Sequence, residues 1–219
     1  VENLKGPSER KWSLFREKDV RSASIVTILR KYIYSCRTRK RRDTMETVDI
    51  IIPAYRPGKE FENLLDSLST QNYPVEKILV MNTEEKFWNT AWEKKFPKVD
   101  VVHLKKADFD HGGTRCRGAR LSDSDIMVFM TQDAVPADRN LIGNLIRPLQ
   151  ANSKVGAAYA RQLAREDCAY LEKYTRRFNY PETSSIKWEK DTGTYGIKTY
   201  FCSNVCAAYK KSIYEEIGG

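Results

Sequence analysis

The sequence of 219 residues is poor in histidine and has no paired cysteines. It contains two histidines, His103 and His111, and five cysteines, none of which belongs to a C-x-x-C pair. A structural zinc site needs four closely spaced ligands, and a disulfide framework needs an even set of cysteines. The composition therefore predicts reduced thiols in a cytoplasmic protein, with core packing as their role.

Long apolar runs and several common catalytic motifs are also absent. The most apolar stretch of the leading segment, residues 24–34, is interrupted by Arg30 and Lys31. It is far shorter than the roughly 20 apolar residues of a membrane span. The patterns G-x-G-x-x-G, G-x-x-x-x-G-K-[ST] and G-x-S-x-G do not occur. These absences count against a Rossmann dehydrogenase, a P-loop enzyme and a serine hydrolase.

Nearly all of the net positive charge lies at the start of the chain. Residues 1–44 hold 13 Lys and Arg against 5 Asp and Glu, whereas residues 45–219 hold 25 against 24. For residues 1–44 two interpretations stay open. One is a basic amphipathic helix on an anionic membrane surface, or an arm on nucleic acid; the other, favoured for solvated charge runs, is a poorly ordered extension. The near-neutral remainder makes nucleic acid an unfavoured partner.

From Val48 onward, strand patterns alternate with helical ones. Strands are expected at residues 48–52, 77–82, 99–104, 125–131 and 154–160, and helices at residues 58–71, 84–96 and 139–150, with a short one within residues 108–121. Asp138 is expected to cap the helix at residues 139–150. This alternation predicts an α/β fold with a mostly parallel sheet flanked by helices. After Arg161 the pattern loosens, which indicates loops and short helices that build a second face.

Polar residues follow four of the expected strands. They are Pro53-Ala54-Tyr55-Arg56, Asn82-Thr83, the loop Asp108 to Arg115, and Thr131-Gln132-Asp133. Ligands of open parallel sheets bind beyond the carboxyl ends of the strands. We therefore expect these four segments to converge around one crevice.

Asp133 has two interpretations in such a crevice. It can cap the turn before Pro136, or it can hold a divalent cation that bridges phosphate oxygens. The nearby Gly112-Gly113 pair lets backbone approach a ligand, and Arg115 can form a charge-assisted pair with phosphate, which favours the second interpretation. A simple turn explains the glycines equally well. For His111 a structural role is favoured over a proton carrier.

Five segments, read in order, carry a resemblance to a known family. They are "VDIIIPAYRP", "DFDHGGTRCRGARLSDSDIMVFMTQDAVP", "YARQL", "FNYP" and "FCSNVCAAYKKSIYEEIGG". As an ordered set they resemble family 2 glycosyltransferases of the GT-A fold, above all the rhamnosyltransferase branch, over residues 48–219. The resemblance implies a GT-A-type, Rossmann-like sheet in residues 45–219. Residues 48–160 would form its nucleotide-binding half, and residues 161–219 the start of its acceptor half.

The resemblance also implies an activity. It is the inverting transfer of a sugar, with rhamnose favoured, from a nucleotide-sugar donor such as dTDP-rhamnose to a hydroxyl of a saccharide or lipid-linked acceptor. A Mg²⁺ or Mn²⁺ ion on the diphosphate is the implied cofactor. The implied process is the synthesis of a cell-surface polysaccharide. The implied location of the protein is the cytoplasm, with peripheral contact at the inner membrane face.

Site residues follow by position in the family's motifs. Asp133 matches the second acid of the Asp-x-Asp metal motif, whereas Thr131 departs from the first. The implied substrate-binding residues are Pro53, Ala54, Tyr55, Asn82, Arg115, Gln132 and Asp133. Among them, Pro53 to Tyr55 flank the nucleotide base, and Asn82 stands where many relatives have a base-reading Asp.

No catalytic residue is assigned. The family's general base lies in a Glu-Asp-like motif beyond the glycine pair that corresponds to Gly218-Gly219, where this sequence ends. Asp167, Glu182 and Asp191 are available carboxylates with surface positions favoured for each. The alternative to a transferase is therefore a truncated, non-catalytic nucleotide-sugar-binding remnant, and donor turnover separates the two.

Overall fold

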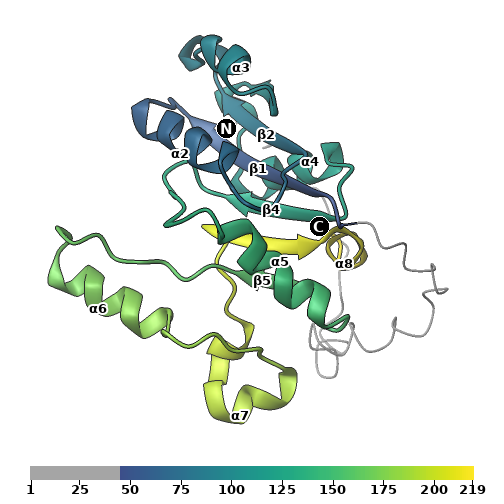
Figure 1. The fold of residues 1–219 in the computed structure, drawn as a ribbon, viewed down its shortest axis with the longest axis vertical. Helices are drawn as coiled ribbons and strands as arrows, with labels where there is room; N and C mark the ends of the chain where they lie inside the picture. The colour runs from purple at the N-terminus through teal and green to yellow at the C-terminus, as the bar shows by residue number, and fades with distance from the viewer. Residues whose placement is uncertain (1–44) are drawn as a thin grey trace, which may run out of the picture. The chain divides into compact units, whose positions relative to one another are not determined.

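Residues 45–219, the part of the chain that the computed structural model describes, fold around a six-stranded sheet in the order β3-β2-β1-β4-β6-β5 (Figure 1). The strands are β1 (Val48–Tyr55), β2 (Lys77–Thr83), β3 (Val99–Leu104), β4 (Ile126–Met130), β5 (Ala157–Tyr159) and β6 (Cys206–Lys210). Strands β1 to β4 pair in parallel, and β6 runs antiparallel between β4 and β5. The expected α/β fold with a mostly parallel sheet is confirmed. The predictions for residues 1–44, Cys36 among them, lie outside the described residues.

Helices cover both faces of the sheet. The α-helices are α2 (Lys59–Ser69), α3 (Ala91–Lys95), α4 (His111–Leu121), α5 (Leu141–Ala151), α6 (Tyr170–Asn179), α7 (Thr192–Tyr195) and α8 (Lys211–Glu216). Short 3-10 turns are η1 (Glu85–Phe87), η2 (Lys106–Asp108), η3 (Glu189–Asp191) and η4 (Gly196–Tyr200). Side chains of α2, α3 and α5 pack in one core cluster, whereas α4 and α8 pack in another on the opposite face.

The two core layers follow from the alternation of side chains along each strand. Ile50 and Ile52 belong to the layer with α2 and α5, and Ile51 between them belongs to the layer with α4. The buried stripe of α2 is Phe61, Leu64, Leu65 and Leu68, at the spacing expected of an amphipathic helix. The stripe of α5 is Ile142, Leu145, Ile146 and Leu149, and the helix continues past Pro148 to Ala151.

Two expected boundaries differ in the structure. Strand β1 does not end at Pro53 but continues to Tyr55, paired with β2 alone beyond Ile51. The missing N–H of Pro53 faces the side on which β4 has already ended, so no ladder bond is lost there. The expected helix at residues 84–96 is only η1 and α3, separated by residues 88–90, and the ring of Trp88 in this gap packs against Phe61.

The segment between β5 and β6 was the least predictable part. It contains α6, η3, α7 and η4 and lies at the β5 edge of the sheet (Figure 1). Strand β6 was not predicted, because its sequence, Cys206–Lys210, is short and lacks a clear alternation. Among residues 45–219, no helix is both long and apolar enough to span a bilayer. Cys116, Cys168, Cys202 and Cys206 are free thiols.

Candidate functional site at the carboxyl edge of the sheet

Parallel pairing brings most of the predicted site residues to one edge. In the β1–β2 register Ala54 lies beside Asn82, and Tyr55 lies beside Thr83. Strand β4 ends at Met130, so Thr131, Gln132 and Asp133 follow at the same edge. Pro53, Ala54, Tyr55, Asn82, Gln132 and Asp133 therefore converge, as the topology rule for open parallel sheets requires.

Gln132 joins the ends of β1 and β4. Its side-chain Oε1 accepts a hydrogen bond from the Tyr55 backbone N–H at 2.7 Å, and its Nε2 donates to the Tyr55 carbonyl at 3.1 Å. The amide thus occupies the place that the next residue of β4 would take in the ladder. Because both polar ends of the Gln132 side chain are used in this way, its role in the structure is to hold Tyr55.

Asp133 follows directly in the turn and is exposed. The turn is closed by the backbone, through a hydrogen bond from Ala134 N–H to the Thr131 carbonyl at 3.2 Å. The Asp133 carboxylate makes no hydrogen bond or ion pair with any of residues 45–219. The interpretation of Asp133 as a turn cap is therefore wrong, and its oxygens are free for a ligand.

Buried polar atoms without partners gather near this edge. Asn82 is fully buried, and its Nδ2 lies 3.0 Å from His103 Nδ1 and 3.3 Å from the Glu84 carbonyl, which it donates to. The Asn82 Oδ1 has no partner, and neither have Thr83 Oγ1 and Thr131 Oγ1. Unpaired buried polar atoms cost free energy and are rare in native folds. Their accumulation here marks a place where a polar ligand would satisfy them.

Arg115 lies one turn into α4, the helix that covers the face of the sheet opposite to α2 and α5. Asp110 caps this helix by accepting from Gly113 N–H at 2.5 Å. Gly112 and Gly113 lie within its first turn rather than in an open loop. Arg115 donates from Nη1 to the His111 carbonyl at 2.8 Å, and its buried Nε has no partner. Burial lowers the pKa of Arg115 from its ordinary value, yet the guanidinium remains a cation at neutral pH.

The rim contains residues outside the predicted set of substrate-binding residues. The guanidinium carbon of Arg56 lies 5.1 Å from the ring centroid of Tyr55 and 4.6 Å from that of Phe87. The two rings themselves meet edge to face at 6.1 Å. Lys106 lies 6.0 Å from the Tyr55 ring centroid. Together they form a cationic, aromatic rim suited to a base and an anion.

Backbone strain occurs at the same rim. Arg56 and Glu84, which follow β1 and β2, have φ values of 48° and 65° and are the non-glycine residues with positive φ among residues 45–219. Such conformations cost free energy and concentrate at functional sites. No sequence signal marked them, because neither residue type favours positive φ.

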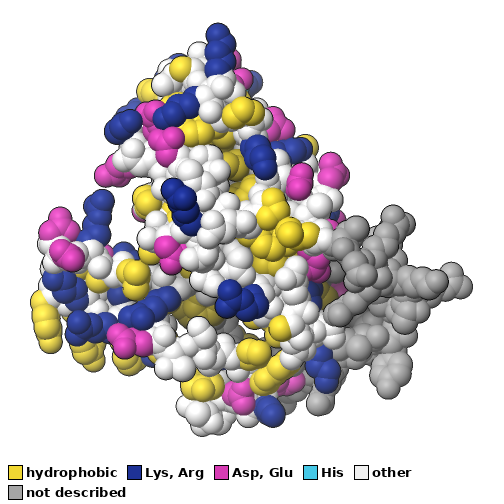
Figure 2. Space-filling view, in the orientation of Figure 1, with side chains coloured by type: hydrophobic (Ala, Val, Ile, Leu, Met, Phe, Trp, Pro, Cys, Tyr) yellow, Lys and Arg dark blue, Asp and Glu magenta, His cyan; other side chains and the backbone are white. Residues whose placement is uncertain are grey.

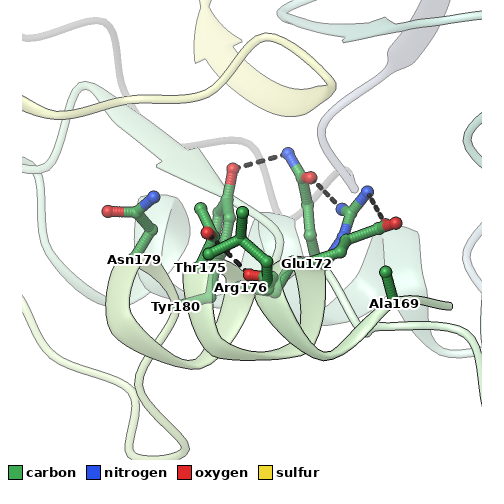
Figure 3. Close-up of a pocket in the computed structure, with 8 residues that line it drawn as sticks. Ala169, Glu172, Thr175, Arg176, Asn179 and Tyr180 are labelled. Atoms are coloured by element: carbon green, nitrogen blue, oxygen red, sulfur yellow. Dashed lines mark hydrogen bonds and ion pairs between the residues drawn. The ribbon is translucent and has the colours of Figure 1, made fainter.

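A hollow lies beside α6 at the carboxyl end of β5 (Figure 3). Its volume is about 550 Å³, and its wall includes Gln162, Glu172, Arg176 and Tyr180. Gln162 donates from Nε2 to Tyr180 Oη at 2.5 Å and to Ser203 Oγ at 3.0 Å, and it accepts from Arg176 Nη1. This α6 cavity is lined by polar groups that can bind hydroxyls.

The free carboxylate of Asp133 is suited to bind a divalent cation. Residues 45–219 contain no cluster of three or more His, Cys, Asp or Glu side chains that could hold a metal by themselves. Mg²⁺ commonly binds through one or two carboxylates plus substrate phosphates and water. One free carboxylate at the site is therefore a sufficient protein ligand if a diphosphate supplies the others.

Comparison with known sequences identifies a family and two related proteins. Residues 49–218 match the family described as Glycosyl transferase family 2. The O-antigen chain rhamnosyltransferase RfbN of Salmonella typhimurium is 34% identical over 173 residues, 78% of this chain and 55% of that protein. The O-antigen chain rhamnosyltransferase WbaN of Salmonella anatum is 29% identical over 177 residues, 80% of this chain and 56% of that protein. The chain spans about half the length of these curated relatives.

Solved structures share the fold. The mannosyltransferase PcManGT from Pyrobaculum calidifontis, in complex with GDP-Man and Mn²⁺, superposes with a TM-score of 0.57 at 17% identity, over 87% of this chain and 52% of that chain. TarS of S. aureus, in complex with UDP-GlcNAc, superposes with a TM-score of 0.53 at 12% identity, over 78% and 47%. These likenesses confirm the expected GT-A-type architecture.

Proposed function

Since the chain belongs to glycosyl transferase family 2, we propose that it transfers a sugar from a nucleotide-sugar donor to an acceptor hydroxyl. The observation that carries the proposal is the free Asp133 carboxylate at the carboxyl edge, beside buried polar atoms without partners. The names of the relatives RfbN and WbaN favour rhamnose as the sugar, and hence dTDP-rhamnose as the donor. They also favour a saccharide or lipid-linked acceptor in cell-surface polysaccharide synthesis.

The donor's nucleoside would lie over β1 and β2. The Tyr55 ring offers a stacking surface, with Pro53 and Ala54 behind it in β1. Asn82 Oδ1 is covered in this structure, and it would accept from a base N–H or a ribose hydroxyl if the donor displaced the side chains above it. Specificity would then come from hydrogen bonding at a buried site, where a missing partner is costly.

The diphosphate would lie between Asp133 and Arg115. A Mg²⁺ or Mn²⁺ ion held by Asp133 would neutralise charge that develops on the leaving diphosphate. Arg115 adds a cation on α4, in the first turns of the helix that begins at this edge. Gln132 would act indirectly, because it orients both Tyr55 and the turn that presents Asp133.

We further propose the division of labour that the resemblance implies. Residues 48–160 would bind the donor, and residues 161–219 would begin the acceptor side, with the α6 cavity as a candidate for the acceptor's hydroxyls. The Gln162, Arg176 and Tyr180 groups in its wall supply donors and acceptors for a saccharide. The deprotonation of the acceptor is left without an assigned residue.

Calorimetric titration of dTDP-rhamnose and UDP-glucose, with and without Mg²⁺ or Mn²⁺, tests the donor site. Asp133→Asn should weaken metal-dependent donor binding by about tenfold or more, because a charge-assisted contact is lost. The matched control is Asp123→Asn, which neutralises an exposed carboxylate before β4, at the opposite edge of the sheet. Equal binding by wild type and Asp133→Asn would refute the assignment of Asp133.

Turnover distinguishes the proposal from its alternative. Release of nucleoside diphosphate from the bound donor, by hydrolysis or by transfer to a saccharide, supports a transferase. Metal-dependent binding with no turnover supports the alternative of a non-catalytic nucleotide-sugar-binding remnant.

A further inference from the structure

Helix α6 is amphipathic, but its apolar side faces the solvent. Its most apolar side chains, Tyr170, Leu171, Tyr174 and Phe178, are 82%, 73%, 58% and 59% exposed. Their spacing of one, three or four residues puts them on a single stripe of the helix. We call this set the outer stripe. A surface helix normally turns such a stripe toward the core, so its exposure requires an explanation.

The opposite side of α6 is mostly polar and lines the α6 cavity, with Leu171 at the border between this side and the outer stripe. Arg176 donates from Nη1 to Gln162 Oε1, which lies outside the helix, and from Nε to Glu172 Oε1 within the helix at 3.0 Å. The contact of Arg176 that ties α6 to the rest of the protein is therefore a hydrogen bond. Figure 3 shows Glu172 and Arg176 on the wall of the α6 cavity. None of the ten residues of α6 is buried. The orientation of the helix is therefore fixed by its polar face.

Cations border the outer stripe. Lys173 and Arg177 lie on α6 itself, and Lys198 from η4 places its Nζ 3.1 Å from the Phe178 ring centroid. The acidic residue of the helix, Glu172, faces inward and is paired with Arg176. Figure 2 shows hydrophobic side chains along the outer edge of the α6 region with Lys and Arg beside them. Apolar and aromatic residues flanked by basic ones are the composition of helices that lie in a membrane interface.

We propose that the outer stripe of α6 docks on an anionic lipid bilayer surface. Phe178 and Leu171 would enter the boundary between headgroups and acyl chains, while the tyrosine hydroxyls stay at headgroup level. Arg177 and Lys198 would contact anionic headgroups, whereas Lys173 Nζ donates to the Glu166 carbonyl. A second copy of the chain fits less well, because a symmetric contact would bring the same cations together. The surface is distinct from residues 1–44, and the proposal stands independently of the proposed function.

Flotation of the full chain with vesicles tests the proposal. The vesicles contain equal parts of phosphatidylethanolamine and phosphatidylglycerol, with phosphatidylcholine vesicles as the uncharged comparison. Leu171→Ser with Tyr174→Ser should weaken binding to the anionic vesicles by about tenfold or more. The control, Leu121→Ser with Ile217→Ser, also removes two exposed apolar side chains, but away from α6, and should leave binding unchanged.

A second variant tests the electrostatic part without changing the apolar stripe. Arg177→Gln should weaken binding to the anionic vesicles severalfold and should not affect binding to phosphatidylcholine. Unchanged thermal unfolding confirms that each variant is folded.

Three results would overturn the proposal. The first is a wild-type chain that does not float with anionic vesicles. The second is flotation that persists in the Leu171→Ser, Tyr174→Ser variant, since binding would then come from another surface such as residues 1–44. The third is sedimentation that shows a dimer which the same variant dissociates, because the occupant of the stripe would then be a second copy.

Discussion

The Gln132 side chain and the Tyr55 backbone form two hydrogen bonds that join the ends of β1 and β4 at the candidate site. The N–H and the carbonyl of Tyr55 point toward β4, whose backbone ladder with β1 has ended at Phe129, and the amide of Gln132 replaces the missing strand. This pair fixes the end of β1 relative to the turn that carries Asp133.

Replacing Gln132 by Leu should destabilise the fold by about 1–3 kcal/mol, because two partly buried backbone groups lose their partners. Donor binding should weaken as well, since Tyr55 and the Asp133 turn are no longer held together. Urea unfolding and calorimetric titration measure the two effects. Unfolding that matches wild type would show that water replaces the amide at no cost.

Gly118 allows α4 to approach the sheet closely. A Cβ at this position would lie 2.6 Å from Ile51 Cγ2, and Ile51 is fully buried. Gly118→Ala should therefore reduce the free energy of unfolding by about 1–2 kcal/mol, overpacking being only partly offset by helix propensity.

Gly143→Ala in α5 is the matched control for Gly118→Ala. A Cβ at Gly143 meets nothing nearer than Tyr73 Cβ at 3.9 Å. The change should raise the free energy of unfolding by about 0.5–1 kcal/mol. If both substitutions stabilise the protein, the close packing of α4 on Ile51 is incorrect.

Burial raises the pKa of the Cys206 thiol to about 12. In the unfolded chain the thiol ionises near its ordinary pKa of 9.0. Above that pH the unfolded state binds fewer protons than the folded state, so stability falls as pH rises toward 12. At about pH 10.5 the Cys206 thiol should lower the free energy of unfolding by about 2 kcal/mol relative to neutral pH.

Cys206→Ala isolates this contribution to the pH dependence. The variant should lose less stability than wild type over the same pH interval, whatever its stability at neutral pH. Urea unfolding at several pH values measures the difference. Identical pH dependence in both proteins would contradict the raised pKa of Cys206.

Gln162 connects α6 to the body of the protein. Gln162→Leu removes the partner of Arg176 outside α6 and two hydrogen bonds to Tyr180 and Ser203. Amide hydrogen exchange in residues 160–205 should become faster by about tenfold or more, while the strands of the sheet stay protected. Gln150→Leu, which removes a single long contact of 3.4 Å to Tyr73 Oη, serves as the control.

The strand and helix patterns before residue 161 were readable because local periodicity matched the final burial. Ile50, Ile51 and Ile52 are apolar in succession because both faces of a central parallel strand are covered. The start of α5 was less readable. We expected Asp138 to cap it, but Asp138 accepts from Asn140 N–H just before the helix, and Gln71 from a distant loop accepts from Ile142 N–H at 3.1 Å. Asp138 as the cap was wrong, because the partner came from another part of the chain.

The amino-acid sequence by itself determined the α/β class, the parallel half of the sheet and the family, since these rest on periodicity and on motifs that are local in the chain. It also predicted Asp133 as a ligand, from its place in the turn after a strand, and that assignment stays a prediction. Only the tertiary structure decided that the amide of Gln132 holds Tyr55, that β6 enters antiparallel between β4 and β5, and that α6 turns its apolar stripe outward. Each of these depends on contacts between residues far apart in the chain, and no local pattern encodes them.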